Sequence, residues 1–73
     1  MSFLEHLNLL RRIDALIRRK ATGNYIQLSK KLGVSQASIY RYLDDLRSLG
    51  APVVYCRLRQ SFYYSEPYEL KIY

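Results

Sequence analysis

The stretch LGVSQASIYRYL, residues 32–43, contains the end of one helix, a tight corner and the start of another helix. Gly33 stands where the first helix ends, because glycine adopts the left-handed backbone conformation of helix ends most readily. Ser35 follows and is a good N-cap residue for a new helix. The two helices are therefore expected to meet across a corner of about three residues.

The helix before the corner is predicted over about residues 25–32. Asn24 is a good N-cap residue, and Gln27 three residues later completes a capping-box pattern. Leu28 and Leu32 are spaced so that both side chains face one core.

The helix after the corner is predicted over about residues 36–49. Its apolar side chains recur at helical spacing and should form one buried stripe: Ile39, Leu43 and Leu46. Gly50 ends this helix as Gly33 ends the one before it.

A longer helix is expected upstream, over about residues 3–20. Its inward face is predicted from apolar side chains at helical spacing: Phe3, Leu7, Leu10, Ile13 and Ile17. Leu9 and Leu16 widen this apolar face beyond the usual arc. The sequence TGN at 22–24 then breaks the helix.

The pattern changes after Pro52, where short runs rich in β-branched and aromatic residues predict strands. Two such runs, separated by a brief polar break, indicate a β-hairpin over about residues 53–65, turning around Arg59, Gln60 and Ser61. A tail follows at 66–73. The predicted fold class is therefore mainly α with a small β-hairpin (α+β), in one domain over residues 1–73.

Charge favours a polyanionic partner. The net charge is +6 and the sequence pI is about 9.7. Such a balance is typical of nucleic-acid binding and less often of binding to an anionic membrane surface.

Composition argues against several other classes. The single cysteine, Cys56, excludes an internal disulfide framework and fits a reducing cytoplasm. Neither Cys56 nor the lone His6 has partners at metal-ligand spacing, so no metal and no cofactor is expected. Asp44 and Asp45 diverge on their helix and do not form a general acid–base pair, so no enzyme activity is expected. No apolar run reaches membrane-spanning length.

At residue level, LSKKLGVSQASIYRYLDDLRSLGAPV (28–53) resembles the DeoR-like, type 11 winged helix-turn-helix domain of bacterial transcriptional regulators, including those with WYL domains. The matching positions are Leu28, Leu32, Gly33, Val34, Ser35, Ile39, Tyr40, Arg41, Leu43, Leu46, Leu49 and Gly50. The chain departs from the family at Tyr42, at Cys56 and in a hairpin turn without glycine. No small-molecule effector domain is visible. The sequence leaves open whether these residues are a complete protein or part of a longer regulator.

The resemblance implies that the third helix lies in the DNA major groove. The residues expected to read DNA are Ser35, Gln36, Ala37, Ser38, Tyr40 and Arg41. Gln pairs well with adenine edges and Arg with guanine edges, while Ala37 can touch a thymine methyl group. A passive, solvated helix face is the alternative.

Phosphate contacts are predicted from the second helix, which crosses the DNA backbone in this motif. Lys30 and Lys31 suit such contacts, although a surface lysine pair is as often simply solvated. Asn24 and Tyr25 lie at the helix N-terminus, where free backbone N–H groups attract phosphate. For Asn24 the alternative is capping alone.

The wing is predicted to add Arg57, Arg59 and Gln60. Arg57 and Arg59 are expected on one face of the first wing strand, with Gln60 near the hairpin tip. A wing arginine can enter the minor groove or grip phosphate. For Arg57, an edge-strand arginine that only prevents aggregation is an equal alternative.

These inferences predict sequence-specific binding of double-stranded DNA by a cytoplasmic transcriptional regulator. A winged helix that binds another protein is the main alternative, and an RNA-binding domain is a weaker one. A homodimer is expected through the first helix and the tail, from apolar residues that one small core should struggle to cover: Leu9, Leu16, Tyr68, Leu70, Ile72 and Tyr73. Packing of these side chains within one chain is the alternative.

Overall fold

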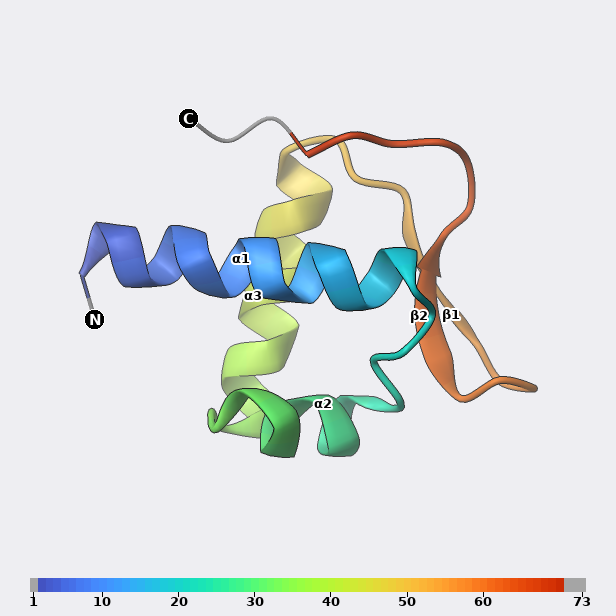
Figure 1. Cartoon of the computed structure of the whole chain (residues 1–73), viewed down its shortest axis with the longest axis horizontal. Helices are drawn as coiled ribbons and strands as arrows, with labels where there is room; N and C mark the ends of the chain where they lie inside the picture. Colours follow the sequence, from blue (N-terminus) through green and yellow to red (C-terminus); the bar gives the residue numbers. More distant parts are fainter. Residues whose placement is uncertain (1, 71–73) are drawn as a thin grey trace.

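Three helices precede a two-stranded antiparallel β-hairpin in the computed structural model, which describes residues 2–70 (Figure 1). The elements are α1 (Phe3–Arg18), α2 (Tyr25–Leu32), α3 (Gln36–Ser48), β1 (Val53–Cys56) and β2 (Ser61–Tyr64). This architecture confirms the predicted fold class, mainly α with a small hairpin.

The corner between α2 and α3 forms as its capping residues predict. Gly33 has a φ of 69°, in the left-handed region, and ends α2. The hydroxyl of Ser35 accepts a hydrogen bond from the backbone N–H of Ser38 and caps the start of α3. The two helices are thus joined by a short connection in which each end has its own hydrogen-bonded cap.

Helix α1 differs from its prediction at both ends. It ends at Arg18, two residues before the expected position, because Lys20 has a φ of 55° and cannot continue the helix. At the other end, Ser2 and Glu5 form an unpredicted capping box. Phe3 was expected to face inward, which is wrong: its side chain is 75% exposed, because the first turns of α1 extend past α3 (Figure 1).

The core lies where α1 crosses α3, closed by α2 below and by the hairpin at one side (Figure 1). The buried apolar residues are Leu10, Ile13, Ile17, Leu28, Leu32, Ile39, Tyr42, Leu43, Leu46, Ala51, Val53 and Phe62. Every helix and both strands contribute to this list, so burial of one shared core fixes the helices relative to the hairpin.

The hairpin turn lies earlier in the sequence than predicted. Cys56 pairs with Ser61, so the turn comprises residues 57–60. Ser61, expected in the turn, is instead the first residue of β2 and is buried. Arg57, expected on the first strand, lies in the turn. Gln60 has a φ of 49° and supplies the left-handed residue that glycine supplies in many turns.

A buried hydroxyl explains this register. Thr22, in the loop after α1, is fully buried, and its Oγ1 accepts the backbone N–H of Phe62 at 2.9 Å. The same oxygen lies 3.0 Å from the hydroxyl oxygen of Ser61 and donates to the carbonyl of Gly23 at 2.9 Å. Ser61 is therefore held in the strand, against the loop between α1 and α2.

The residues expected to form a dimer interface pack within the chain. Leu9, Leu16, Tyr68 and Leu70 are partly buried against the core described above. Packing within one chain was the alternative to a homodimer interface in the sequence analysis. Because these side chains are partly covered by the chain's own core, their apolar area gives no support to such an interface. Ile72 and Tyr73 lie outside the described residues.

The segment after the hairpin is tied to α1. The Arg18 guanidinium bonds both carboxylate oxygens of Asp14 and the carbonyl of Tyr68. The Tyr64 hydroxyl also donates to Asp14, and burial, followed by that bond, raises the pKa of Tyr64 well above its ordinary value.

Candidate nucleic-acid interface

Helix α3 divides into a buried face and an exposed face. Ile39, Tyr42, Leu43 and Leu46 are buried against the rest of the domain. The exposed side chains of its first two turns are those of Gln36, Ala37, Tyr40 and Arg41. None of these four is acidic, and together they offer an amide, a methyl group, a phenol and a guanidinium to a partner.

Ser35 and Ser38 are bonded to each other at the start of this face. The Ser35 hydroxyl accepts the Ser38 N–H at 3.2 Å and donates to the Ser38 hydroxyl at 3.0 Å. Ser38 is half-buried, and its own hydroxyl proton can still be donated outward. Capping is therefore the primary role of Ser35, whereas Ser38 retains a donor.

Tyr25 and Tyr40 form a pair that sequence reasoning did not foresee. Their ring centroids are 5.1 Å apart with an interplanar angle of 39°. Desolvation, followed by a hydrogen bond with Tyr25, raises the pKa of Tyr40. The pair joins the start of α2 to the exposed face of α3.

At the N-terminus of α2, Asn24 is committed to capping. Its side-chain oxygen accepts the Gln27 N–H at 2.9 Å, and its own backbone N–H donates to the Gln27 side chain at 2.9 Å. The expectation that this N–H is free for phosphate is therefore wrong. A capping box satisfies both donors within the helix end.

Lys30 and Lys31 are both exposed, in the last turn of α2. The Lys31 ammonium donates to the carbonyl of Ala21, in the loop after α1. Lys31 also lines a groove of about 350 Å³ together with Arg12 of α1 and Arg19, which caps the end of α1. The structure thus places Lys31 with the basic residues of α1.

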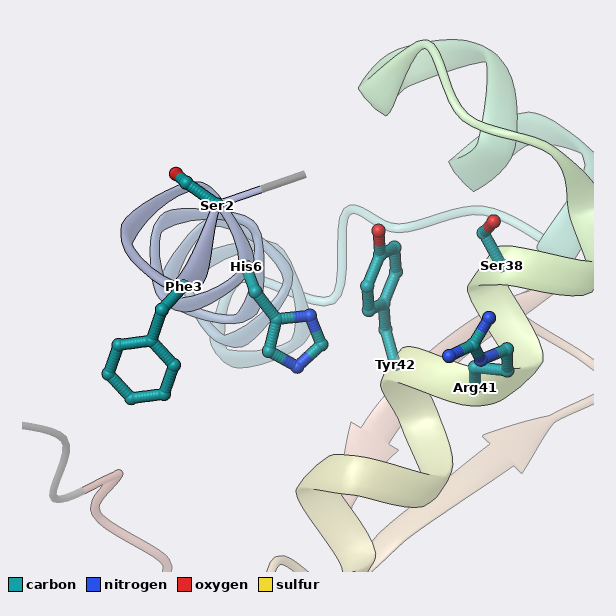
Figure 2. A pocket seen from close by; sticks show the side chains of 6 residues that line it. All are labelled: Ser2, Phe3, His6, Ser38, Arg41 and Tyr42. Atoms are coloured by element: carbon teal, nitrogen blue, oxygen red, sulfur yellow. The ribbon is translucent and has the colours of Figure 1, made fainter.

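His6 links α1 to α3, which sequence reasoning missed. Its Nε2 lies 3.0 Å from a carboxylate oxygen of Asp45, and its ring centroid lies 5.3 Å from that of Tyr42. Figure 2 shows His6 directed toward Tyr42, beside Ser38 and Arg41 on α3. These residues, with Ser2 and Phe3, line a cavity of about 330 Å³. Nothing in the local pattern around His6 signals a contact between two distant elements.

The hairpin turn carries the predicted wing residues. Arg57, Arg59 and Gln60 are all exposed in the turn, and Leu58 between the arginines is 98% exposed. In Figure 1 the tip points toward the same end of the molecule as α2 and the start of α3. The arginines therefore lie on the connection itself and not along one strand face.

Within residues 2–70, no group of three or more His, Cys, Asp or Glu side chains is arranged to hold a metal ion. No helix in the described part of the chain is long and apolar enough to cross a membrane.

Three helices, a short corner before the third and a β-hairpin after it define a winged helix-turn-helix. The comparison with protein families agrees: the family model described as HTH domain (HTH_11) matches residues 11–56. The chain belongs to this family of helix-turn-helix DNA-binding domains. None of the curated proteins and none of the solved structures matches the chain.

Proposed function

We propose that this protein is a transcriptional regulator that binds specific sequences in double-stranded DNA. This proposal rests mainly on the exposed face of α3, where Gln36, Tyr40 and Arg41 project from a helix whose other face is buried. The family match supports placing this helix in the major groove. There Gln36 suits an adenine edge and Arg41 suits a guanine edge. The compartment expected for such a regulator is the bacterial cytoplasm.

The phosphate contacts that we propose come from α2 and the wing. Tyr25, at the start of α2, lies against Tyr40 of α3 and presents a phenol hydroxyl beside the exposed face of α3, and Lys30 presents a cation from the last turn of α2. Arg57 and Arg59 extend the positive charge to the hairpin tip. These contacts orient the protein on the duplex, while α3 supplies the sequence preference.

A winged helix that binds only another protein remains the competing function. A surface of that kind is typically depleted of charge at its centre and rich in apolar side chains. The first turns of α3 instead carry an amide, a phenol and a guanidinium, in a protein of net charge +6. This charge and chemistry favour DNA.

We also propose that two copies act together. A single module of this size covers about 600–1,000 Å² of its own surface on DNA and gives modest discrimination. Two copies on two half-sites multiply that discrimination. A symmetric selected sequence, together with the solution mass of the complex by light scattering, tests this part of the proposal; an asymmetric sequence bound by one copy contradicts it.

Selection of bound duplexes from a random-sequence pool at low salt tests the function. We expect one enriched motif. On duplexes that carry this motif, Gln36→Ala and Arg41→Ala should each cost about 1–3 kcal/mol of binding free energy. Each variant should also relax the preference at single base pairs.

Lys30→Ala serves as the matched control, because loss of a phosphate contact weakens binding to all sequences alike. Equal losses on the selected and on random duplexes for Gln36→Ala and Arg41→Ala would show that α3 is not the reader. Absence of binding to any duplex at low salt would favour the protein-binding alternative.

A further inference from the structure

The most exposed large apolar side chain among those described belongs to Leu58, at the tip of the hairpin, with 98% of its surface accessible. A single exposed leucine is ordinary on a protein surface and by itself indicates nothing. Leu58 differs in its setting, because it lies between Arg57 and Arg59 in a turn without any acidic residue. An apolar tip flanked by two cations is complementary to duplex DNA, which has charged phosphates outside and stacked, apolar base faces inside.

The hairpin holds this tip outward. Val53, at the base of the hairpin, and Phe62, near the turn, are buried in the core, and the start of β2 is bonded to Thr22. The turn closes through Gln60 in the left-handed conformation, which is uncommon and unfavourable for a residue other than glycine. The exposure of Leu58 is therefore built into an ordered turn.

We infer that Leu58 enters the DNA minor groove and wedges between two stacked base pairs, where it partly unstacks them and bends the duplex. This inference rests on the proposed function. The hairpin tip points toward the same end of the molecule as the start of α3 (Figure 1). With α3 in the major groove, we therefore expect the tip to meet the next groove along the duplex, which is a minor groove. Arginines are attracted to its negative potential, and leucine is one of the side chains that proteins insert between base steps there.

The bases that accept such a wedge are predictable. Pyrimidine–purine steps, above all TA, unstack and kink most readily. We therefore expect a preference for such a step at the flank of the selected sequence, at a position that no side chain of α3 contacts. Replacing it with a stiffer step should weaken binding of the intact protein and leave Leu58→Ala less affected.

The direct test uses 2-aminopurine, whose fluorescence rises when it is unstacked, placed in turn at each flanking position of the selected duplex. Under saturating protein, we expect a rise at one step for the wild type and for Leu58→Phe, and none for Leu58→Ala. Leu58→Ala should also bind about tenfold more weakly and bend the duplex less in a gel assay.

Leu49→Ala is the matched control. Leu49 is 52% exposed and caps the C-terminal end of α3, whereas the residues proposed to read DNA lie in its first turns. This variant should behave as the wild type in both assays. If the wild type binds its selected duplex but raises no fluorescence at any flank, or if Leu58→Ala raises it equally, the wedge is wrong and the proposed function stands. If Leu58→Ala instead lowers the solution mass without changing fluorescence, Leu58 contacts a second copy and the wedge is also wrong. Absence of duplex binding by the wild type overturns the proposed function itself.

Discussion

Thr22 carries a buried hydroxyl that joins two distant parts of the chain, the loop after α1 and strand β2. Its Oγ1 accepts the Phe62 N–H and lies beside the Ser61 hydroxyl, while it donates to Gly23. A buried donor left without a partner costs about 1–3 kcal/mol. For a protein of this size, that is a large part of the total stability.

We expect Thr22→Val to lower the free energy of unfolding by about 1–3 kcal/mol, because valine keeps the shape of threonine but leaves the Phe62 N–H unpaired. Urea denaturation followed by circular dichroism measures this loss. Thr22→Ser keeps the hydroxyl and should lose clearly less. Equal losses for valine and serine would mean that methyl packing, and not the hydroxyl, holds the loop to β2.

Tyr64 should make the fold sensitive to alkali. Burial, followed by the hydrogen bond to Asp14, raises its pKa above the ordinary value of 10.0. The unfolded chain therefore releases this proton at a lower pH than the folded chain does. The stability contributed by neutral Tyr64 is complete below pH 10 and is lost as the pH rises further.

Tyr64→Phe removes this titration, so its unfolding free energy should fall less between pH 8 and pH 10.5 than that of the wild type. Denaturation curves at the two pH values provide the comparison. Tyr63→Phe, on the neighbouring residue of β2, is the control and should keep the wild-type pH dependence. A wild-type slope in Tyr64→Phe would contradict the assignment.

At the scale of elements, the corner between α2 and α3 depends on Gly33. Its φ of 69° is a conformation that other residues adopt at a cost, yet a Cβ placed there would meet no atom within 4 Å. The cost of a substitution is therefore in the backbone alone.

Gly33→Ala should reduce the unfolding free energy by about 1–2 kcal/mol, and Gly33→Asn by less, because asparagine tolerates the left-handed region better. Thermal unfolding of the two variants and the wild type gives the order. If alanine is no worse than asparagine, the corner has moved out of the left-handed conformation.

The helices show what local rules can predict. The caps of α2 and α3 depend on residues three or four positions apart, so Asn24, Gly33 and Ser35 could be assigned from the sequence. The hairpin turn could not, because its register depends on Thr22 contacting Ser61 across the fold. Sequence rules carry no information on which loop will meet which strand.

The same division holds for the candidate site. The exposed face of α3 follows from its apolar stripe, so Gln36 and Arg41 could be placed in advance. The Tyr25–Tyr40 pair, the contact of His6 with Asp45 and the direction of Lys31 involve different elements and were not foreseen. Phe3 was placed inward because helical spacing does not show where a helix extends past its neighbour.

For the whole molecule, whose net charge is +6, the number of cations in contact with phosphates should set the salt dependence of DNA binding. Each phosphate that a cation neutralises releases counterions and adds about 0.9 to the slope of log affinity against log salt. Arg59→Gln should therefore reduce the slope by about 1 and leave the base preference opposite α3 unchanged. Gln36→Ala should change the motif and not the slope. Titrations at several salt concentrations measure both, and a changed slope for Gln36→Ala would contradict this separation.

The bonds between Thr22 and β2 also bear on the distance between the two parts of the protein that we propose to contact DNA. Thr22, in the loop after α1, bonds Ser61 and Phe62 beside the hairpin turn, and Val53 and Phe62 are buried in the core that α3 shares. We therefore expect the distance between α3 and the hairpin tip to change little. One base pair inserted between the bases facing α3 and the flank facing the tip shifts that flank by about 3.4 Å and turns it by roughly a tenth of a helical turn. A hinged arm would follow this displacement. A tip that is held in place reaches the wrong step. If α3 and the tip contact DNA as proposed above, we therefore expect the bound sequence to keep the spacing between these two contacts to the base pair, even where the intervening bases vary.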